Sequence, residues 1–446
     1  MLADECLRLL GAGSKVQTER GGVLVHGDAQ AAMRLNLECR LAQRVLWPLA
    51  HGLYASEHDL YALARQVAWP EWITPQQTLK VDVTAQRSPL KSLNFAALRI
   101  KDAVCDVLRE ATGERPSVDT QRPDLPLALH LSPTHATLYV DTSGQPLFKR
   151  GWRDAAGQKG EAPLKETLAA ALLAAAGWAG RAEDGPLFDP CCGAGTIAIE
   201  AAQIACGIAP GLNRHFAFER LLPFAAQRPA WQRMKDAARA RQHPSAVLIF
   251  AGDVSFRMTD FASRNAERAG VAGSIAFLTA DALQRPPPAE RGVLVLNPPY
   301  GERIDPKGSS GGERIDPKGS SGGARIDPKR SSGGEQVGPR NSGRESFDGG
   351  ASAAAFYAAL AAHWKRRYAG WTAWILSPDM KLPQALRLKE SRRVPLWNGP
   401  IECRLFRFEL VAGSARARPG AEPSDARPGA EPSDAQPDAA PPQSES

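Results

Sequence analysis

The side chains best suited to chemistry form the segment Asn297-Pro298-Pro299-Tyr300, directly after the apolar residues 293–296. Two successive prolines fix φ and lack backbone donors, so they make a rigid turn that exposes carbonyl oxygens. An amide oxygen together with a proline carbonyl can accept both hydrogens of an aromatic amine, and a phenol ring can stack on its base. Without further support, an Asn-Pro-Pro segment more often marks an ordinary strand-ending turn.

A second segment, residues 189–196 (DPCCGAGT), lies between an apolar strand and a helix. Its glycines allow a close backbone approach to a ligand, and the N-terminus of the helix offers free N–H groups. Gly193 and Gly195 with Ala198 also match the dinucleotide-binding pattern. That pattern expects an acid about 20 residues further on, whereas here a long insertion separates Asp253 from the loop. A nicotinamide-dependent oxidoreductase is therefore disfavoured.

Two acids follow the second and third strands expected in this region, Asp253 and Asp281. They could contact a ligand at the edge of a sheet, but they also fit as helix N-caps or loop acids. Thr167, in the preceding helix, could contact the ligand, or it could be only a capping and solvent-facing residue of that helix. Cys191 and Cys192 have no adjacent basic residue, so we interpret them as small packing residues rather than reactive thiols.

The elements that must position these residues alternate between strand and helix after about residue 150. The pattern predicts strands at 187–189, 247–250, 275–278, 293–296 and 372–376, and helices at 164–176, 195–206, 257–268 and 353–367. Such alternation indicates a parallel, doubly wound sheet, in which ligands bind at the carboxyl ends of the strands. The Asn-Pro-Pro turn would then face the ligand crevice.

The first 150 residues show a different pattern, with short strands and helices that do not alternate regularly. We predict strands at 23–27, 79–85, 127–132 and 136–141, and helices at 29–47 and 92–110. This mixture indicates an α+β region.

Two further segments are tandem repeats of low complexity. An 11-residue unit occurs at 301–311, 312–322 and 323–333, and a nine-residue unit at 417–425 and 426–434. Neither unit has the apolar content to pack against its neighbour, so we expect both segments to be disordered. The sequence therefore divides into an N-terminal region (1–152), an α/β domain (160–411) with a flexible insertion (301–350), and a disordered tail (412–446).

Composition limits the class of protein. The chain has 446 residues, 43% of them hydrophobic, which suits two or three domains of about 100–200 residues each. The longest apolar stretch, 168–179, is shorter than the roughly 20 residues that cross a bilayer, and the acidic start MLADE is unlike a secretory signal. The seven cysteines are irregularly spaced, with no pair at zinc-ligand spacing. We expect a cytoplasmic protein without a metal site or a membrane anchor.

The positive charge is concentrated in one segment. The chain carries a net charge of +7, and residues 351–411 alone contain ten basic and four acidic residues. A basic cluster suits a phosphate-backbone partner, although a solvated helix face would look the same.

Taken together, DPCCGAGT, the two intervening acids and NPPYGER resemble the class I methyltransferases that use S-adenosyl-L-methionine. The segments PLKETLAAALL (163–173) and IAPGL (208–212) narrow the resemblance to the RlmL-type 23S rRNA guanine-N2 methyltransferases. LNFAALRIKDAVCD (93–106) and LFKRGWR (147–153) resemble that family's THUMP RNA-binding region. The resemblance covers about residues 1–300 and 351–410. It implies a class I Rossmann-like methyltransferase sheet preceded by a ferredoxin-like and THUMP-containing region. In that family a strand precedes the first helix, which LADECLRLLGAG resembles. We therefore expect that this chain starts later than the family's members do.

The resemblance assigns roles residue by residue. The cofactor-binding residues that it implies are Thr167, Asp189, Pro190, Cys192, Gly193, Gly195, Thr196, Asp253 and Asp281. Among these, Asp253 would bind the ribose hydroxyls and Asp281 the adenine amine. The catalytic residues that it implies are Asn297, Pro298, Pro299 and Tyr300. Asn297 and Pro298 would hold the target amine, and Tyr300 would stack on the guanine.

The implied substrate is 23S rRNA or a large-subunit precursor, and one activity is expected. Three alternatives stay open: a tRNA guanine-N2 methyltransferase, a DNA adenine-N6 methyltransferase, and an RNA-binding assembly factor whose methyltransferase fold is inactive. The sequence does not indicate an oligomeric state.

Overall fold

The computed structural model describes residues 1–153, 164–298 and 349–411. The predicted repeat insertion, the predicted tail, Pro299 and Tyr300 lie outside the described residues. Within the described ranges, no helix is long and apolar enough to cross a membrane.

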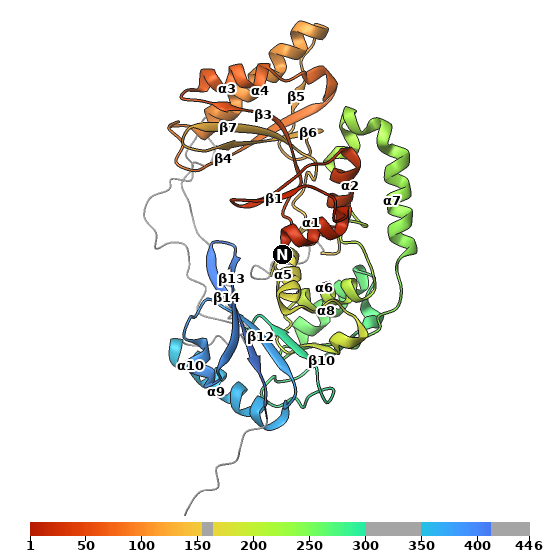
Figure 1. Ribbon diagram of the computed structural model, residues 1–446, viewed down its shortest axis with the longest axis vertical. Coiled ribbons are helices and arrows are strands. Elements are labelled where there is room, and N and C mark those ends of the chain that lie inside the picture. The colour runs from red at the N-terminus through yellow and green to blue at the C-terminus, as the bar shows by residue number, and fades with distance from the viewer. Residues whose placement is uncertain (154–163, 299–348, 412–446) are drawn as a thin grey trace, which may run out of the picture. The chain divides into compact units, whose positions relative to one another are not determined.

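The second half of the chain forms a seven-stranded sheet in the order β10-β9-β8-β11-β12-β14-β13 (Figure 1). Its strands are β8 (Leu187–Asp189), β9 (Ile249–Asp253), β10 (Ile275–Thr279), β11 (Val293–Leu296), β12 (Thr372–Ser377), β13 (Glu390–Asn398) and β14 (Ile401–Glu409). The first five are mutually parallel, as the alternating pattern predicts.

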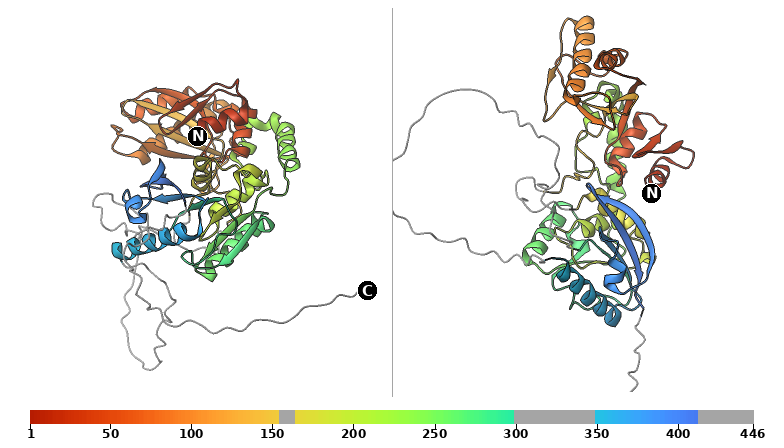
Figure 2. Two further views of the ribbon diagram at one scale, coloured as in Figure 1. Left: turned by 60° about the horizontal axis from the view of Figure 1, so that its bottom comes forward. Right: turned by 90° about the vertical axis from the view of Figure 1, so that its left-hand side faces the viewer.

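The last two strands correct the expectation of a wholly parallel sheet. β14 pairs antiparallel with both β12 and β13. The reason is local: Asn398 and Ile401 are paired across a two-residue connection, which is too short for the crossover that a parallel pair needs. Gly399 supplies the positive φ of 65° in this turn. The two strands form a long, curved hairpin, drawn in blue in Figure 2.

Helices cover both faces of this sheet. One core lies between the sheet and helices α5 (Glu166–Ala176), α6 (Thr196–Ala205) and α8 (Phe256–Arg268), and the other lies against α9 (Gly349–Arg367) and α10 (Leu382–Leu386). β11 shows why both faces are apolar: Val295 belongs to the first core, whereas Leu294 and Leu296 belong to the second. This is the two-sided burial expected of a parallel strand.

The N-terminal region begins with α1 (Leu2–Leu10), the paired strands β1 (Val16–Glu19) and β2 (Gly22–Val25), and α2 (Ala29–Glu38). A five-stranded sheet follows, in the order β3-β7-β6-β4-β5. Its elements are β3 (Leu46–Leu53), α3 (Glu57–Arg65), β4 (Thr78–Ala85), α4 (Leu93–Thr112), β5 (Ser117–Val118), β6 (Leu125–Leu131) and β7 (His135–Asp141). Helices α3 and α4 lie side by side on one face of this sheet (Figure 1). The predicted α+β region is confirmed.

The helix predicted at 29–47 is wrong beyond residue 38. The buried carboxylate of Glu5 accepts hydrogen bonds from the backbone N–H groups of Arg40 (2.9 Å) and Leu41 (3.0 Å). These donors therefore point at α1 instead of continuing the helix, and Cys39 is already extended. Residues 46–53 then pair with β7.

The insertion between α6 and β9 packs against the N-terminal region. It contains two 3-10 helices (Ala217–Arg220 and Leu222–Gln227) and α7 (Arg228–Ala240). Phe216, Phe218, Phe224 and Trp231 of this insertion share one hydrophobic core with Met33 of α2. Residues distant from the N-terminal region in sequence therefore complete its core.

Candidate active site

The glycine-rich loop follows β8 as predicted, and its first acid is deeply buried. Asp189 is 1% exposed, and its Oδ1 accepts a hydrogen bond from the backbone N–H of Cys191 at 3.2 Å. Burial, helped by the nearby Asp253 carboxylate, raises the pKa of Asp189 well above its usual range. A buried carboxyl with so few protein donors is placed to meet a cationic group of a ligand.

The two glycines of the loop have different structural reasons to be glycine. Both have positive φ, 51° at Gly193 and 82° at Gly195. A Cβ at Gly195 would also lie 2.9 Å from Cβ of Ala262 on α8, whereas a Cβ at Gly193 would meet nothing within 4 Å. Gly195 therefore allows α6 and α8 to approach each other, and Gly193 only shapes the turn.

Asp253 lies at the end of β9 and is tied to this loop. Its Oδ2 accepts the backbone N–H of Gly193 at 3.0 Å, and its Oδ1 accepts that of Ser255 at 3.0 Å. The N-cap of α8 is Ser255 and not Asp253, so the N-cap alternative is wrong for this acid. Each carboxylate oxygen has a remaining lone pair that can accept a hydroxyl donor.

Asp281 lies at the same edge of the sheet, because Asp253 pairs with Thr279 two residues before it. Its Oδ1 accepts the backbone N–H of Leu283 at 2.8 Å, and its Oδ2 accepts a longer bond of 3.2 Å from Gln284. The acid therefore shapes a turn and keeps a polar oxygen at the ligand edge.

Asn297 follows β11, which lies between β8 and β12. The pairing of Leu294 with Phe188 places Asn297 beside the loop that begins after Asp189. The Oδ1 atom of Asn297 is buried and has no hydrogen-bond partner among the residues that the structure describes. Buried polar atoms are nearly always paired, so this oxygen is available to accept a hydrogen bond from a bound molecule. Pro298, also buried, follows it.

The remaining predicted residues are placed less specifically. Thr196 is the first residue of α6. Thr167 is buried on α5, where its Oγ1 lies 3.5 Å from the side-chain amide of Gln43. Burial raises the pKa of the Cys191 and Cys192 thiols well above their usual range, which agrees with packing residues. Pro190 continues the loop between Asp189 and Cys191.

The sequence did not indicate a set of side chains that brace this loop. Arg153 bonds through Nε to Glu166 of α5 (2.5 Å) and through Nη2 to Oγ1 of Thr196 (2.7 Å). Asn265 of α8 donates to the carbonyl oxygen of Ala194 at 3.0 Å. From the sequence, LFKRGWR resembles only part of a THUMP region. No rule of sequence spacing pairs Arg153 with Glu166, which lies 13 residues later at the start of a helix.

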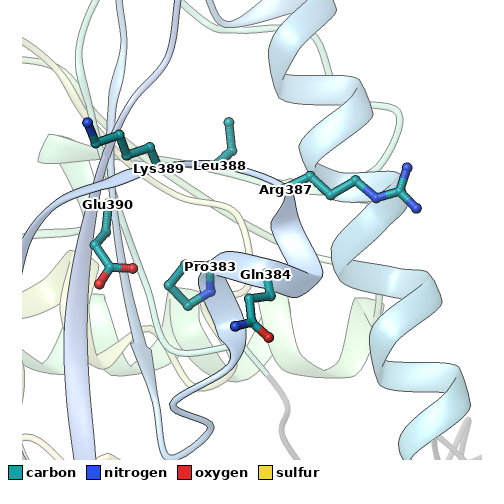
Figure 3. A pocket seen from close by; sticks show the side chains of 6 residues that line it. All are labelled: Pro383, Gln384, Arg387, Leu388, Lys389 and Glu390. Carbon is teal, nitrogen blue, oxygen red and sulfur yellow. The ribbon is translucent and has the colours of Figure 1, made fainter.

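Over residues 1–153, 164–298 and 349–411, no group of three or more His, Cys, Asp or Glu side chains is arranged to hold a metal ion. A shallow hollow of about 510 Å³ lies instead between α10 and β13, and Figure 3 shows its lining. Its residues are Pro383, Gln384, Arg387, Leu388, Lys389 and Glu390, none of which belongs to the glycine loop or the Asn-Pro turn.

Comparisons with known proteins identify the family of the chain. Three family models match in succession: the RlmL ferredoxin-like domain over residues 1–46, the THUMP domain over 54–141, and the RMKL-like methyltransferase domain over 150–313. A Synechocystis protein named as an RNA methyltransferase is 32% identical over 92% of this chain and 94% of its own length. The chain belongs to this family of THUMP-containing RNA methyltransferases.

One solved structure bears on the cofactor, and a further relative is named for ribosomal RNA. A methyltransferase crystallised with S-adenosylhomocysteine has a TM-score of 0.72 and 25% identity, over 92% of this chain and 95% of that one. The ribosomal RNA large subunit methyltransferase K/L of Syntrophotalea carbinolica is 36% identical over 92% of this chain, but over only 52% of its own length. The chain thus spans about half the length of that relative. Its cofactor is S-adenosylmethionine, and its substrate class is RNA.

Proposed function

We propose that this RNA methyltransferase methylates the exocyclic N2 amine of a guanine in 23S rRNA or a large-subunit precursor. The observation that carries the proposal is the buried Oδ1 of Asn297 beside the glycine loop, which has no hydrogen-bond partner within residues 1–153, 164–298 and 349–411. The resemblance of NPPYGER to the guanine-N2 methyltransferases and the likeness to a K/L relative support the substrate. Such a substrate implies a cytoplasmic site of action.

The residues present fit the cofactor. Asp189 is a buried carboxyl with one backbone donor, and Asp253 and Asp281 lie along the same sheet edge. We propose that Asp189 and the backbone from Pro190 to Thr196 hold the amino-acid end, Asp253 the ribose, and Asp281 the adenine. S-adenosylmethionine supplies a methyl group that is already activated as a sulfonium.

The protein's remaining task is to prepare the amine and align it. A guanine amine is a poor nucleophile because its lone pair is delocalised into the ring. Asn297 Oδ1 and the carbonyl oxygen of Pro298 would each accept a hydrogen bond from the amine. These two hydrogen bonds favour a pyramidal nitrogen with an available lone pair. Holding the reacting atoms in line at about 3–3.5 Å supplies most of the rate enhancement. Pro299 and Tyr300, outside the described residues, would complete this corner by fixing the turn and stacking on the base.

The basic segment near the hollow would contact RNA phosphates. Figure 3 shows the side chains of Arg387 and Lys389 extending in opposite directions from the chain between α10 and β13. Lys365, at the end of α9, donates to the backbone carbonyl of Arg387 at 2.9 Å and so holds the segment in place. Cations fixed on one surface suit a phosphate backbone.

The test is methyl transfer to deproteinised 23S rRNA, followed by nucleoside mass spectrometry. Asn297→Ala should lower kcat by about 100-fold or more, the usual scale for losing one positioned polar group, because the amine loses an acceptor. Its affinity for S-adenosylhomocysteine should change by less than about twofold, because Asn297 does not bind the cofactor. Asn213→Ala, at an exposed asparagine, is the matched control. Full activity in the Asn297 variant would reject the proposed role.

A second candidate is an adenine-N6 methyltransferase, favoured by the same Asn-Pro-Pro-Tyr motif, since an adenine amine offers the same two hydrogens. Loss of N6-methyladenine from DNA, and not of N2-methylguanosine from RNA, after gene deletion would favour that candidate. Loss from tRNA alone would favour a tRNA guanine-N2 enzyme. An inactive assembly factor would retain RNA binding but transfer no methyl group.

A further inference from the structure

A second hollow, of about 130 Å³, lies where the insertion after α6 meets α2. It is lined by Met33, Phe218, Glu219, Phe224, Arg228 and Trp231. Three of these residues carry aromatic rings packed edge to face or tilted: Phe218 lies 5.0 Å from Trp231 at 83° and 5.4 Å from Phe224 at 37°. The hollow is far too small for a helix or a folded partner, and half of its six lining residues are aromatic.

One polar atom of this lining lacks a partner. The side chain of Trp231 is more than nine-tenths buried, and its Nε1 has no acceptor within the part of the chain that the structure describes. Among the other buried indoles, Trp69 donates to Ala64 O at 2.8 Å and Trp178 to Gly185 O at 3.1 Å. Trp152 Nε1 also lacks a partner within the described residues, but Trp152 does not line this hollow. An unsatisfied buried N–H on a residue that lines a hollow is a donor that a bound molecule could satisfy.

The charges around the hollow indicate what that molecule carries. Arg228, at the start of α7, is exposed at the hollow, and the same helix carries Arg233, Lys235 and Arg239 with a single acid, Asp236. That acid is already paired with Arg239 at 2.9 Å. The helix therefore presents net positive charge beside an aromatic hollow, which is the combination that holds a base and its phosphates in single-stranded nucleic acid.

We propose that this hollow binds one unpaired nucleobase of the RNA substrate, an inference that rests on the proposed function. The base would stack against the aromatic lining and accept a hydrogen bond from Trp231 Nε1 through a carbonyl oxygen or ring nitrogen. Glu219, whose carboxylate already accepts the backbone N–H of Phe216 at 2.8 Å, has a remaining oxygen for a base amine. Arg228 would contact the adjoining phosphate.

The position of the hollow suggests how such a contact would orient the RNA. Its lining comes from α2 on one side and from the insertion that follows α6 on the other. A base held here would fix the RNA to the N-terminal region and the methyltransferase domain at once. The target guanine would then be presented to Asn297 in one register, which is how a contact outside the reacting centre contributes to rate.

The experiment uses the full chain and 23S rRNA fragments substituted with 4-thiouridine. Photocrosslinks should map to residues 216–231. Trp231→Phe keeps the ring but removes the donor, and it should weaken RNA binding about fivefold, the scale of one hydrogen bond. An RNA that lacks the crosslinked base should lose affinity for the unchanged protein, and Trp231→Phe should weaken binding to that RNA no further.

Trp178→Phe is the matched control, because its N–H is already satisfied within the protein; it should leave RNA affinity unchanged. S-adenosylhomocysteine affinity and the unfolding midpoint of each variant report whether the fold is retained. Absence of crosslinks in 216–231, or unchanged affinity in Trp231→Phe, overturns the proposal. These outcomes are distinct from failure of the proposed function, in which the unchanged protein would methylate no guanine of 23S rRNA.

Discussion

Replacing Glu200 by glutamine removes the charge at the centre of a buried ion triad. Glu200 lies on α6 with no exposed side-chain surface, and its Oε1 bonds to Arg40 Nη1 at 2.8 Å and Arg150 Nη2 at 3.2 Å. The side chain of Arg150 is 1% exposed and that of Arg40 is 15% exposed. Without the carboxylate, two guanidinium groups stay buried with no counter-ion at this position. Breaking such a pair costs about 3–5 kcal/mol, and we expect about 3 kcal/mol because Arg40 reaches some solvent.

The assay is equilibrium urea unfolding of Glu200→Gln beside Glu183→Gln, an exposed glutamate whose loss should cost under about 0.5 kcal/mol. Burial opposes ionisation of Glu200, but Arg150 and Arg40 hold its pKa below the usual range. Because the folded pKa is the lower one, the stabilisation is present above the unfolded pKa and is lost as the pH falls through the folded pKa. The difference in unfolding free energy between the wild-type protein and Glu200→Gln should therefore shrink in acid.

A double variant separates the triad from simple packing. Arg150→Met alone should be destabilising, and combined with Glu200→Met it should cost clearly less than the two single losses together. The reason is that the double variant leaves only the partly exposed Arg40 without its carboxylate. A loss below about 1 kcal/mol in Glu200→Gln, or strictly additive losses in the cycle, would refute the reasoning.

Further predictions concern the cofactor loop and a buried acid. Gly195→Ala should destabilise the protein by about 2 kcal/mol and weaken S-adenosylhomocysteine binding in calorimetry, because a Cβ there would lie 2.9 Å from Cβ of Ala262. Gly193→Ala should cost only the strain of its positive φ, about 1 kcal/mol. Equal effects of the two substitutions would contradict this reasoning. Burial raises the pKa of Asp141 to about 6, against the opposing effect of Arg44. Since the folded pKa exceeds the unfolded value of about 3.9, this residue's contribution to stability is greatest in acid and falls by about 3 kcal/mol as the pH rises through 6. Asp141→Asn should remove that dependence in urea unfolding between pH 4 and 7, and a wild-type slope retained in the variant would exclude Asp141 as its source.

The parallel part of the sheet could be predicted because its strands are short apolar runs at regular intervals. Residues 187–189 and 293–296 are buried on both faces, and such runs are visible without any tertiary information. Loops that follow neighbouring parallel strands meet at one edge, so the glycine loop and Asn297 could also be expected together.

The rest depends on contacts between residues far apart in sequence. Helix α2 ends early because Glu5 binds the backbone donors of Arg40 and Leu41, an effect outside any local window. The amphipathic pattern of α7 shows that it packs against something, but not that its partner is α2. The bracing of Thr196 by Arg153 is likewise fixed only by the fold.

The segment Arg150-Gly151-Trp152-Arg153 connects these long-range contacts. Arg150 bonds to Glu200 of α6, the carbonyl of Trp152 accepts from Arg268 of α8 at 2.8 Å, and Arg153 bonds to Glu166 of α5. The three helices thus braced are those packed around the glycine loop.

The same segment also touches the N-terminal region. Arg150 Nη2 donates to the backbone carbonyl of Arg40 at 2.8 Å, so Arg150 contacts both the N-terminal region and the helix that begins at Thr196. A displacement of the N-terminal region would therefore disturb the bonds to α6. For this reason we expect Glu200→Gln to weaken S-adenosylhomocysteine binding as well as stability, although Glu200 lies one helical turn beyond the cofactor loop.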